Sequence, residues 1–182
     1  ITSKKHESGS DRIFEALEKF DPYQKYQNVI HLQGDLPNIS GNLIKKLATF
    51  IYEPTREILT VVVKANPDEY NDNSIVKAAI AFSKDNPDIN DIGRAMYFSR
   101  ACIPFGETNI WHHVGIYAWK RKTLKQFVSL KPSPLEKSEK LEQLRALEGG
   151  IIIDAIITSD HPIGVDTELD LKKASKFFQD LS

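Results

Sequence analysis

Two short acidic turns have the residue types needed to bind a metal ion. A Gln-Gly-Asp turn ending at Asp35 follows an apolar run at residues 29–32, and a Gly-Val-Asp turn ends at Asp166. A carboxylate just beyond a buried strand, beside a glycine that lets a ligand approach the backbone, is typical of metal-phosphate sites in open α/β sheets. The two turns suggest two ligands to one cation. An ordinary Gly-Asp turn is the alternative for each.

Two arginines are candidates for binding an acidic ligand. Arg12 follows Ser8-Gly9-Ser10, and these residues could form a polar cradle for a carboxylate or phosphate at a helix N-terminus. Arg100 ends an expected strand, where its guanidinium could hold a carboxylate in a bidentate pair. The alternatives are a capped helix with a solvated arginine for the first and an internal ion pair for the second.

The adjacent pair His112-His113 precedes an apolar strand. Neighbouring residues of a strand point to opposite faces, and no cysteine or carboxylate lies at a ligand spacing, so the sequence does not favour structural zinc. By the same alternation, His113 should share a face with Gly115 and Tyr117. The two polar side chains could then meet in one pocket, or they could be satisfied polar groups of the core.

A second polar pair, Glu142 and Gln143, lies between leucines on an expected helix that begins at Pro134. Successive helix residues diverge by about 100°, so at least one of the pair lies near the edge of the buried stripe and could face a ligand. Solvation at the surface is the alternative.

Composition limits the class of protein. The 182 residues suit one domain, and 24 Lys plus Arg against 25 Asp plus Glu give a net charge of −1, which does not favour nucleic acid as a partner. No apolar run approaches the ~18 residues of a membrane span. The single Cys102 excludes an internal disulfide, and we interpret it as a packing residue in a reducing compartment, the cytoplasm.

The apolar pattern predicts an α/β domain with a central sheet covered by helices. The continuous β-branched run at residues 58–63 is typical of a strand buried on both faces. The last helix should begin at the cap Thr167 and bury Leu171, Ala174, Phe178 and Leu181. Other strands are expected at residues 29–32, 75–82, 95–100, 113–119 and 151–158. Other helices are expected from the cap Ser10 to residue 20, from the cap Ser40 to residue 51, and from residue 134 to residue 148.

Seven short strings together resemble one enzyme family. They are Ser8-Gly9-Ser10-Asp11-Arg12, Gln33-Gly34-Asp35-Leu36-Pro37, Tyr97-Phe98-Ser99-Arg100, His113-Val114-Gly115-Ile116-Tyr117, Pro132-Ser133-Pro134-Leu135-Glu136, Leu141-Glu142-Gln143-Leu144-Arg145 and Gly164-Val165-Asp166-Thr167. In this order they resemble the 3-deoxy-manno-octulosonate cytidylyltransferases, also called CMP-Kdo synthetases. The resemblance covers essentially the whole chain.

The resemblance implies a Rossmann-like nucleotidyltransferase with a mixed central sheet flanked by helices. Its expected reaction transfers CMP from CTP to 3-deoxy-manno-octulosonate (Kdo), giving CMP-Kdo and pyrophosphate for lipopolysaccharide biosynthesis. It further implies a homodimer that uses Mg²⁺, with Asp35 and Asp166 as the catalytic metal ligands. The residues expected around the sugar are Arg12, Gln33, Arg100, His113, Tyr117, Glu142 and Gln143.

Two features depart from the family pattern. Leu36 stands where the family usually has glutamate in Gln-Gly-Asp-Glu-Pro, and the sequence lacks the family's leading strand and triphosphate-binding loop. We therefore expect residues 1–182 to form a single, N-terminally truncated domain that is inactive or nearly so by itself. The alternatives are a fragment that retains sugar binding or dimerisation, and a related CMP-sialic acid synthetase.

Overall fold

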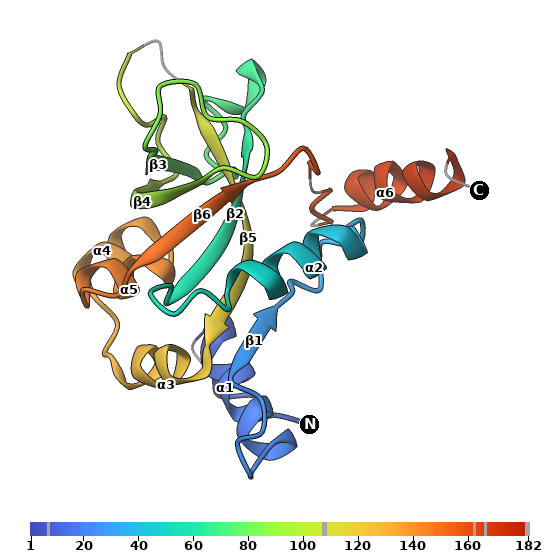
Figure 1. The fold of residues 1–182 in the computed structure, drawn as a ribbon. Coiled ribbons are helices and arrows are strands. Elements are labelled where there is room, and N and C mark those ends of the chain that lie inside the picture. The colour runs from blue at the N-terminus through green and yellow to red at the C-terminus, as the bar shows by residue number, and fades with distance from the viewer. Residues whose placement is uncertain (7, 107–108, 162, 166, 181–182) are drawn as a thin grey trace.

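The computed structural model describes residues 1–6, 8–106, 109–161, 163–165 and 167–180, and its centre is a six-stranded sheet (Figure 1). The strand order is β1-β5-β2-β6-β4-β3. The elements are α1 (Gly9–Phe20), β1 (Asn28–His31), α2 (Gly41–Phe50), β2 (Ile58–Lys64), the short 3-10 helix η1 (Pro67–Glu69), β3 (Lys77–Ala81), β4 (Ile92–Ser99), β5 (Trp111–Lys120), α3 (Arg121–Ser129), α4 (Pro134–Glu139), α5 (Gln143–Glu148), β6 (Ile153–Ile157) and α6 (Glu168–Asp180).

The sheet is mixed. Strands β2 and β6 are parallel, and every other pairing is antiparallel. The first residues of β5 also pair with β3, so one end of the sheet curls back on itself. The expected α/β fold with a mixed central sheet and flanking helices is confirmed.

Strand β2 separates two hydrophobic clusters, as its continuous apolar sequence predicts. Ile58 and Val62 join the cluster beneath α1, α3 and α5, whereas Leu59, Val61 and Val63 join the cluster beneath α2. All six residues from 58 to 63 are buried. Because successive side chains alternate across a strand, a run in which Thr60 is the one polar residue, with its hydroxyl hydrogen-bonded inside the protein, fits a strand covered on both faces.

The region after Ser133 differs from the expected single helix. Ser133 and Glu136 form the predicted capping box, but α4 ends where Lys140 adopts a left-handed conformation with φ of 57°. A separate helix, α5, then begins at Gln143. The prediction was wrong because Lys140 is a good helix former and the sequence contains no glycine or proline at the break.

Three other local expectations need correction. The side chain that caps α1 is that of Ser8, not Ser10, and it accepts a hydrogen bond from the Asp11 amide. Cys102 is exposed and does not contribute to the core. Helix α3, which directly follows β5 and has no side-chain cap, was not predicted, although Leu124, Phe127 and Val128 recur at helical spacing.

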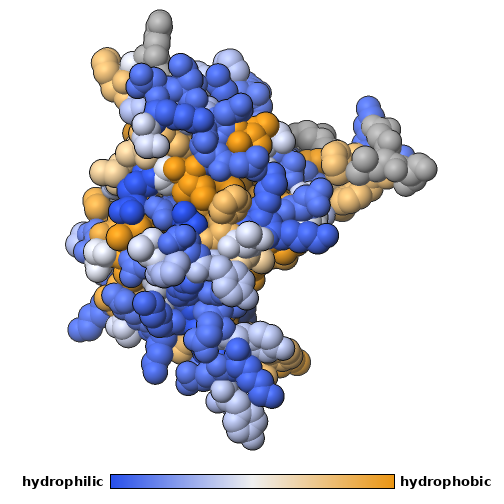
Figure 2. Space-filling model, in the orientation of Figure 1, coloured by the Kyte–Doolittle hydropathy of each residue, from blue (hydrophilic) through white to orange (hydrophobic). Residues whose placement is uncertain are grey.

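Helix α6 extends away from the sheet (Figure 1), and apolar residues remain visible along this arm (Figure 2). Thr167 and Asp170 form the predicted cap, with the Asp170 amide donating to the Thr167 hydroxyl. Ala174 is buried, but Leu171 and Phe178 are exposed, which contradicts the expected buried stripe. Leu181 lies outside the described residues. Among the described helices, none is long and apolar enough to cross a membrane.

Candidate active site

The two acidic turns meet at one edge of the sheet. Asp35 follows β1 and Val165 follows β6, and the Val165 amide donates a hydrogen bond of 2.9 Å to the Asp35 carbonyl. The Asp35 side chain is exposed, so its carboxylate is accessible to a ligand. Asp166 lies outside the described residues, but the residue before it is in contact with the first turn. The described part of the second turn therefore lies beside the first.

Asn38 joins the same two segments through its side-chain amide. Its Nδ2 donates to the His161 carbonyl over 2.9 Å, and its Oδ1 accepts from the Ile163 amide over 2.8 Å. Nearby, the Ser40 hydroxyl donates to Asp160 over 2.5 Å while it caps α2. These bonds fix the segment that leads to the second acidic turn.

Gly115 gives β5 an irregular backbone beside the first turn. Its φ is +67°, a conformation that glycine adopts at little cost, and the pairing of β5 with β2 shifts register here. The Gln33 side chain donates to the Gly115 carbonyl over 3.3 Å. Gln33 is thus held between the Asp35 turn and β5.

His113 and Tyr117 share a face of β5, as the alternation predicted, with ring centroids 5.5 Å apart. The Thr60 hydroxyl donates to the Ile116 carbonyl over 2.7 Å, so it must accept its 2.9 Å hydrogen bond from Nε2 of His113. Burial lowers the pKa of His113 to about 3, and this histidine is therefore a neutral donor. Burial also raises the pKa of Tyr117 well above its ordinary value, with a further contribution from Glu142.

The polar cradle at the start of α1 is filled by the chain's own Glu142. Its carboxylate accepts hydrogen bonds from the Ser10 hydroxyl over 2.9 Å and from the Ser10 amide over 3.4 Å. The partial positive charge of a helix N-terminus favours a carboxylate there. Arg12 instead is exposed and donates to Thr2 and Ser3, so the structure does not bring it to this cluster.

Arg100 is held on the other side of the α4–α5 junction. Its Nε donates to the Glu139 carbonyl over 3.4 Å, and its Nη1 donates to the carbonyls of Asn73 and Ser74. The Glu139 carboxylate accepts from the Arg100 amide over 3.1 Å. The break between α4 and α5 therefore lets Glu139 and Glu142 bind different partners. Gln143, the first residue of α5, is buried.

His31 belongs to this cluster although sequence reasoning did not select it. It is buried, its ring lies 6.2 Å from that of Tyr117, and a Cβ on Gly9 would lie 3.2 Å from its Cε1. Burial lowers its pKa, and Glu142 acts in the opposite direction. Its Nδ1 has no hydrogen-bond partner among the described residues. Sequence reasoning could have selected His31, because it is a histidine in an otherwise apolar run directly before the first acidic turn.

Comparison with known proteins gives consistent results. Residues 1–155 match a family described as "Cytidylyltransferase". The chain is 44% identical over 176 residues to a protein of Nitrobacter hamburgensis named 3-deoxy-manno-octulosonate cytidylyltransferase, covering 97% of this chain and 67% of that protein. A protein of the same name from Brucella anthropi is also 44% identical, with 96% of this chain and 69% of that protein covered.

Solved structures show the same relationship. A CMP:2-keto-3-deoxy-manno-octonic acid synthetase complexed with CTP superimposes with a TM-score of 0.86 at 30% identity, covering 100% of this chain and 72% of that one. An apo UDP-glucose pyrophosphorylase gives a TM-score of 0.65 at 10% identity over 97% of this chain and 62% of that one, a likeness of fold alone.

The Asn38 contacts predict a local effect on backbone opening. Asn38→Ala removes both side-chain hydrogen bonds, so amide hydrogen exchange at Ile163 should accelerate by about fivefold or more, given roughly 1 kcal/mol per hydrogen bond. Exchange within β6 should not change. Asn42→Ala, at an exposed position of α2, is the control. Unchanged exchange at Ile163 in Asn38→Ala would contradict the assigned role.

Buried His113 predicts a loss of stability in mild acid. Its pKa is about 3 in the folded state and about 6.5 in the unfolded state. The neutral ring therefore contributes fully to the free energy of unfolding above about pH 6.5, and this contribution is lost as the pH falls toward 3. His113→Gln keeps a neutral donor near Thr60. Between about pH 6 and 4.5, the free energy of unfolding should depend less steeply on pH in the variant than in the parent. The difference in slope should correspond to about one proton fewer bound on unfolding.

Urea unfolding at several pH values tests this prediction, and circular dichroism at neutral pH confirms that the variant is folded. Asn42→Ala, an exposed substitution on α2 that removes no titrating group, should keep the parental slope. An unchanged slope in His113→Gln would refute the assignment of a neutral buried imidazole.

Proposed function

The chain belongs to the cytidylyltransferase family, and from this premise we propose that it acts as a 3-deoxy-manno-octulosonate cytidylyltransferase. The reaction transfers CMP from CTP to Kdo and releases pyrophosphate, and its product, CMP-Kdo, serves lipopolysaccharide biosynthesis in the cytoplasm. The observation that carries the proposal is the contact of the two acidic turns, through Val165 and Asp35, within a chain so similar to enzymes of that name.

The chemistry requires the anomeric hydroxyl of Kdo to attack the α-phosphorus of CTP. An oxygen–phosphorus bond forms, the bond from the α-phosphorus to the bridging oxygen of pyrophosphate breaks, and the hydroxyl proton is released. Such transfers depend mainly on alignment and on neutralising phosphate charge. The residues around Asp35 would therefore act by positioning the substrates.

Asp35 and Asp166 are the proposed ligands of a catalytic Mg²⁺. Carboxylate oxygens suit this hard cation, and the accessible Asp35 side chain fits the role. When bound, Mg²⁺ would neutralise phosphate charge and orient the phosphate and sugar oxygens. Leu36 packs against the cluster beneath α2, so at this turn Asp35 supplies the charge without a neighbouring glutamate.

The proposed Kdo site uses polar groups from several elements. Arg100 would bind the sugar carboxylate, since within the described part of the chain its Nη2 donates no hydrogen bond. Gln33 and Glu142, which are partly buried, would contact hydroxyls, and the buried His113 and Tyr117 would lie beneath the sugar. Gln143 would support the α5 side, and Arg12 would reach the sugar only by leaving its contacts with Thr2 and Ser3.

The proposed assembly is a homodimer. Apolar side chains remain exposed along α6, among them Leu171, Phe177 and Phe178, and they support association with another surface of the same kind. The net charge of −1 gives no support to nucleic acid as a partner.

Asp35→Asn should abolish turnover in the full-length protein while leaving its fold intact, because the amide removes the charge that binds Mg²⁺. Pyrophosphate release from CTP and Kdo measures turnover, and circular dichroism measures folding. Asp85→Asn, at an exposed aspartate elsewhere, should behave like the parent. Near-normal turnover in Asp35→Asn would refute the metal assignment.

Arg100→Ala should raise the KM for Kdo by roughly tenfold to a hundredfold, since a charge-assisted hydrogen bond contributes about 1.5–3 kcal/mol. The KM for CTP should change little. Arg94→Ala is a matched control, because Arg94 lies on β4, which Arg100 directly follows, but its guanidinium pairs with Asp154. Equal effects of the two substitutions on KM for Kdo would argue against Arg100 as the carboxylate ligand.

A further inference from the structure

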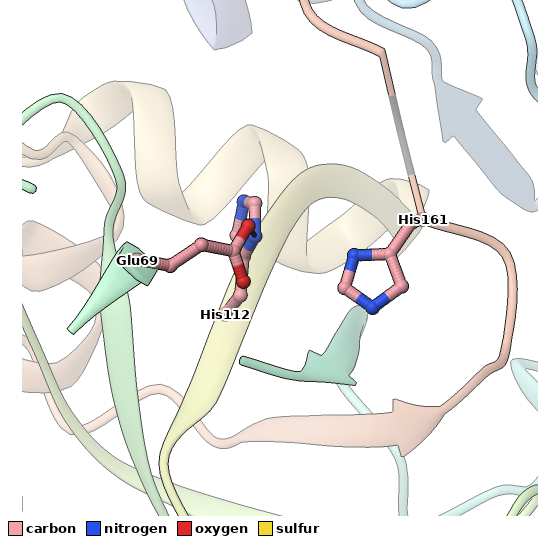
Figure 3. A group of neighbouring side chains, drawn as sticks. All are labelled: Glu69, His112 and His161. Carbon is pink, nitrogen blue, oxygen red and sulfur yellow. Dashed lines mark hydrogen bonds and ion pairs between the residues drawn. The ribbon is translucent and has the colours of Figure 1, made fainter. Parts of the chain in front are cut away.

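Three potential metal ligands converge outside the acidic turns. Glu69 ends η1, His112 lies near the start of β5, and His161 follows β6. One ligand atom from each lies within 4.8 Å of the other two. Figure 3 shows the Glu69 carboxylate over the His112 ring, with the His161 ring beside them. The chain thus brings together two imidazoles and a carboxylate from three separate segments.

We propose that Glu69, His112 and His161 bind a divalent transition-metal ion of the zinc class. Imidazole nitrogen suits Zn²⁺ and its neighbours, whereas Mg²⁺ prefers a shell of oxygens. Two histidines with one glutamate make a known type of three-ligand zinc set, in which a fourth position stays open to water or another ligand. The exposed side of His161 leaves room for that position. The inference does not rest on the proposed function.

The spacing of the ligands is close to what a metal needs. Metal–nitrogen and metal–oxygen bonds of about 2.0–2.2 Å separate neighbouring ligand atoms by roughly 3.3 Å in a tetrahedral site. Glu69 Oε1 and His112 Nδ1 are already 2.9 Å apart and share a hydrogen bond. The three-ligand set would be complete if Glu69 Oε1 and His112 Nδ1 moved slightly apart and the His161 ring moved closer to both.

Two of the ligands are held in place by their surroundings. The second carboxylate oxygen of Glu69 accepts a hydrogen bond of 2.6 Å from the Asn66 amide. His112 is fixed by strand pairing with Val63 on one side and Lys77 on the other. Such support restricts the orientations of ligand side chains and favours metal binding. The third ligand, His161, is tied through its carbonyl to Asn38.

This arrangement explains why the sequence did not favour zinc. His112 and His113 do point to different surroundings, so they cannot bind one ion together. The carboxylate partner of His112 lies 43 residues away, and His161 lies in yet another segment. A bound ion would cross-link η1 and β5 to the segment that leads to Val165, beside Asp35.

Metal binding can be tested with Zn²⁺ as the probe. Protein stripped with a chelator is titrated with Zn²⁺ by calorimetry in the presence of millimolar Mg²⁺, which occupies oxygen-rich sites. We expect one Zn²⁺ per chain and a raised melting temperature. His161→Ala should weaken Zn²⁺ binding by about tenfold or more, and Glu69→Gln should weaken it as well. Co²⁺ should give the visible absorption of a nitrogen-containing tetrahedral site.

The matched control is His6→Ala, which removes a different histidine paired with a glutamate, Glu15. This variant and Asp35→Asn should bind Zn²⁺ as the parent does. The proposal is overturned if the parent binds no stoichiometric Zn²⁺, if His161→Ala binds it with parental affinity, or if Asp35→Asn abolishes binding. In the last case the ion would belong to the acidic turns.

Discussion

The direction of three strands determines where the acidic turns and the Glu69 cluster lie. Strand β5 is antiparallel to both β1 and β2, and β6 is parallel to β2, so β1, β2 and β6 all run the same way. Their carboxyl ends therefore emerge at one edge of the sheet, which is where open α/β sheets bind ligands. Asp35 follows β1, Glu69 follows β2, and His161 and Val165 follow β6. Strand β2, buried from Ile58 to Val63, pairs with both β5 and β6 and so joins these strands.

The sequence allowed this edge to be predicted because its signals are local. An apolar run followed by Gly-Asp can be read within a few residues, and the buried strand at 58–63 requires no knowledge of its neighbours. The pairing of Ser10 with Glu142 is different, because 132 residues separate them and no local pattern links the one to the other. The turn at Lys140 that places Glu142 was also hidden, since tertiary contacts override the helix propensity of lysine there.

Charge in the candidate sugar site is distributed unevenly. His31, His113 and Tyr117 are buried, and burial favours the neutral form of each. Glu142 supplies a negative charge, stabilised by the N-terminus of α1 and the Ser10 hydroxyl. Since that helix terminus already holds a carboxylate, it is a poor position for the carboxylate of an acid sugar. Arg100, on the far side of the α4–α5 junction, is the better partner.

The same edge presents two donor sets of different chemical character. The acidic turns offer only oxygen, whereas the Glu69 cluster offers two imidazole nitrogens and one carboxylate. Donor type alone would therefore direct Mg²⁺ and Zn²⁺ to different places. The segment after β6 contributes to both, because His161 is one of the nitrogen donors and the Val165 amide contacts the Asp35 carbonyl. Asn38 is bonded to this segment at the His161 carbonyl and the Ile163 amide, so the chain that carries the second imidazole is tied to the chain that follows Asp35.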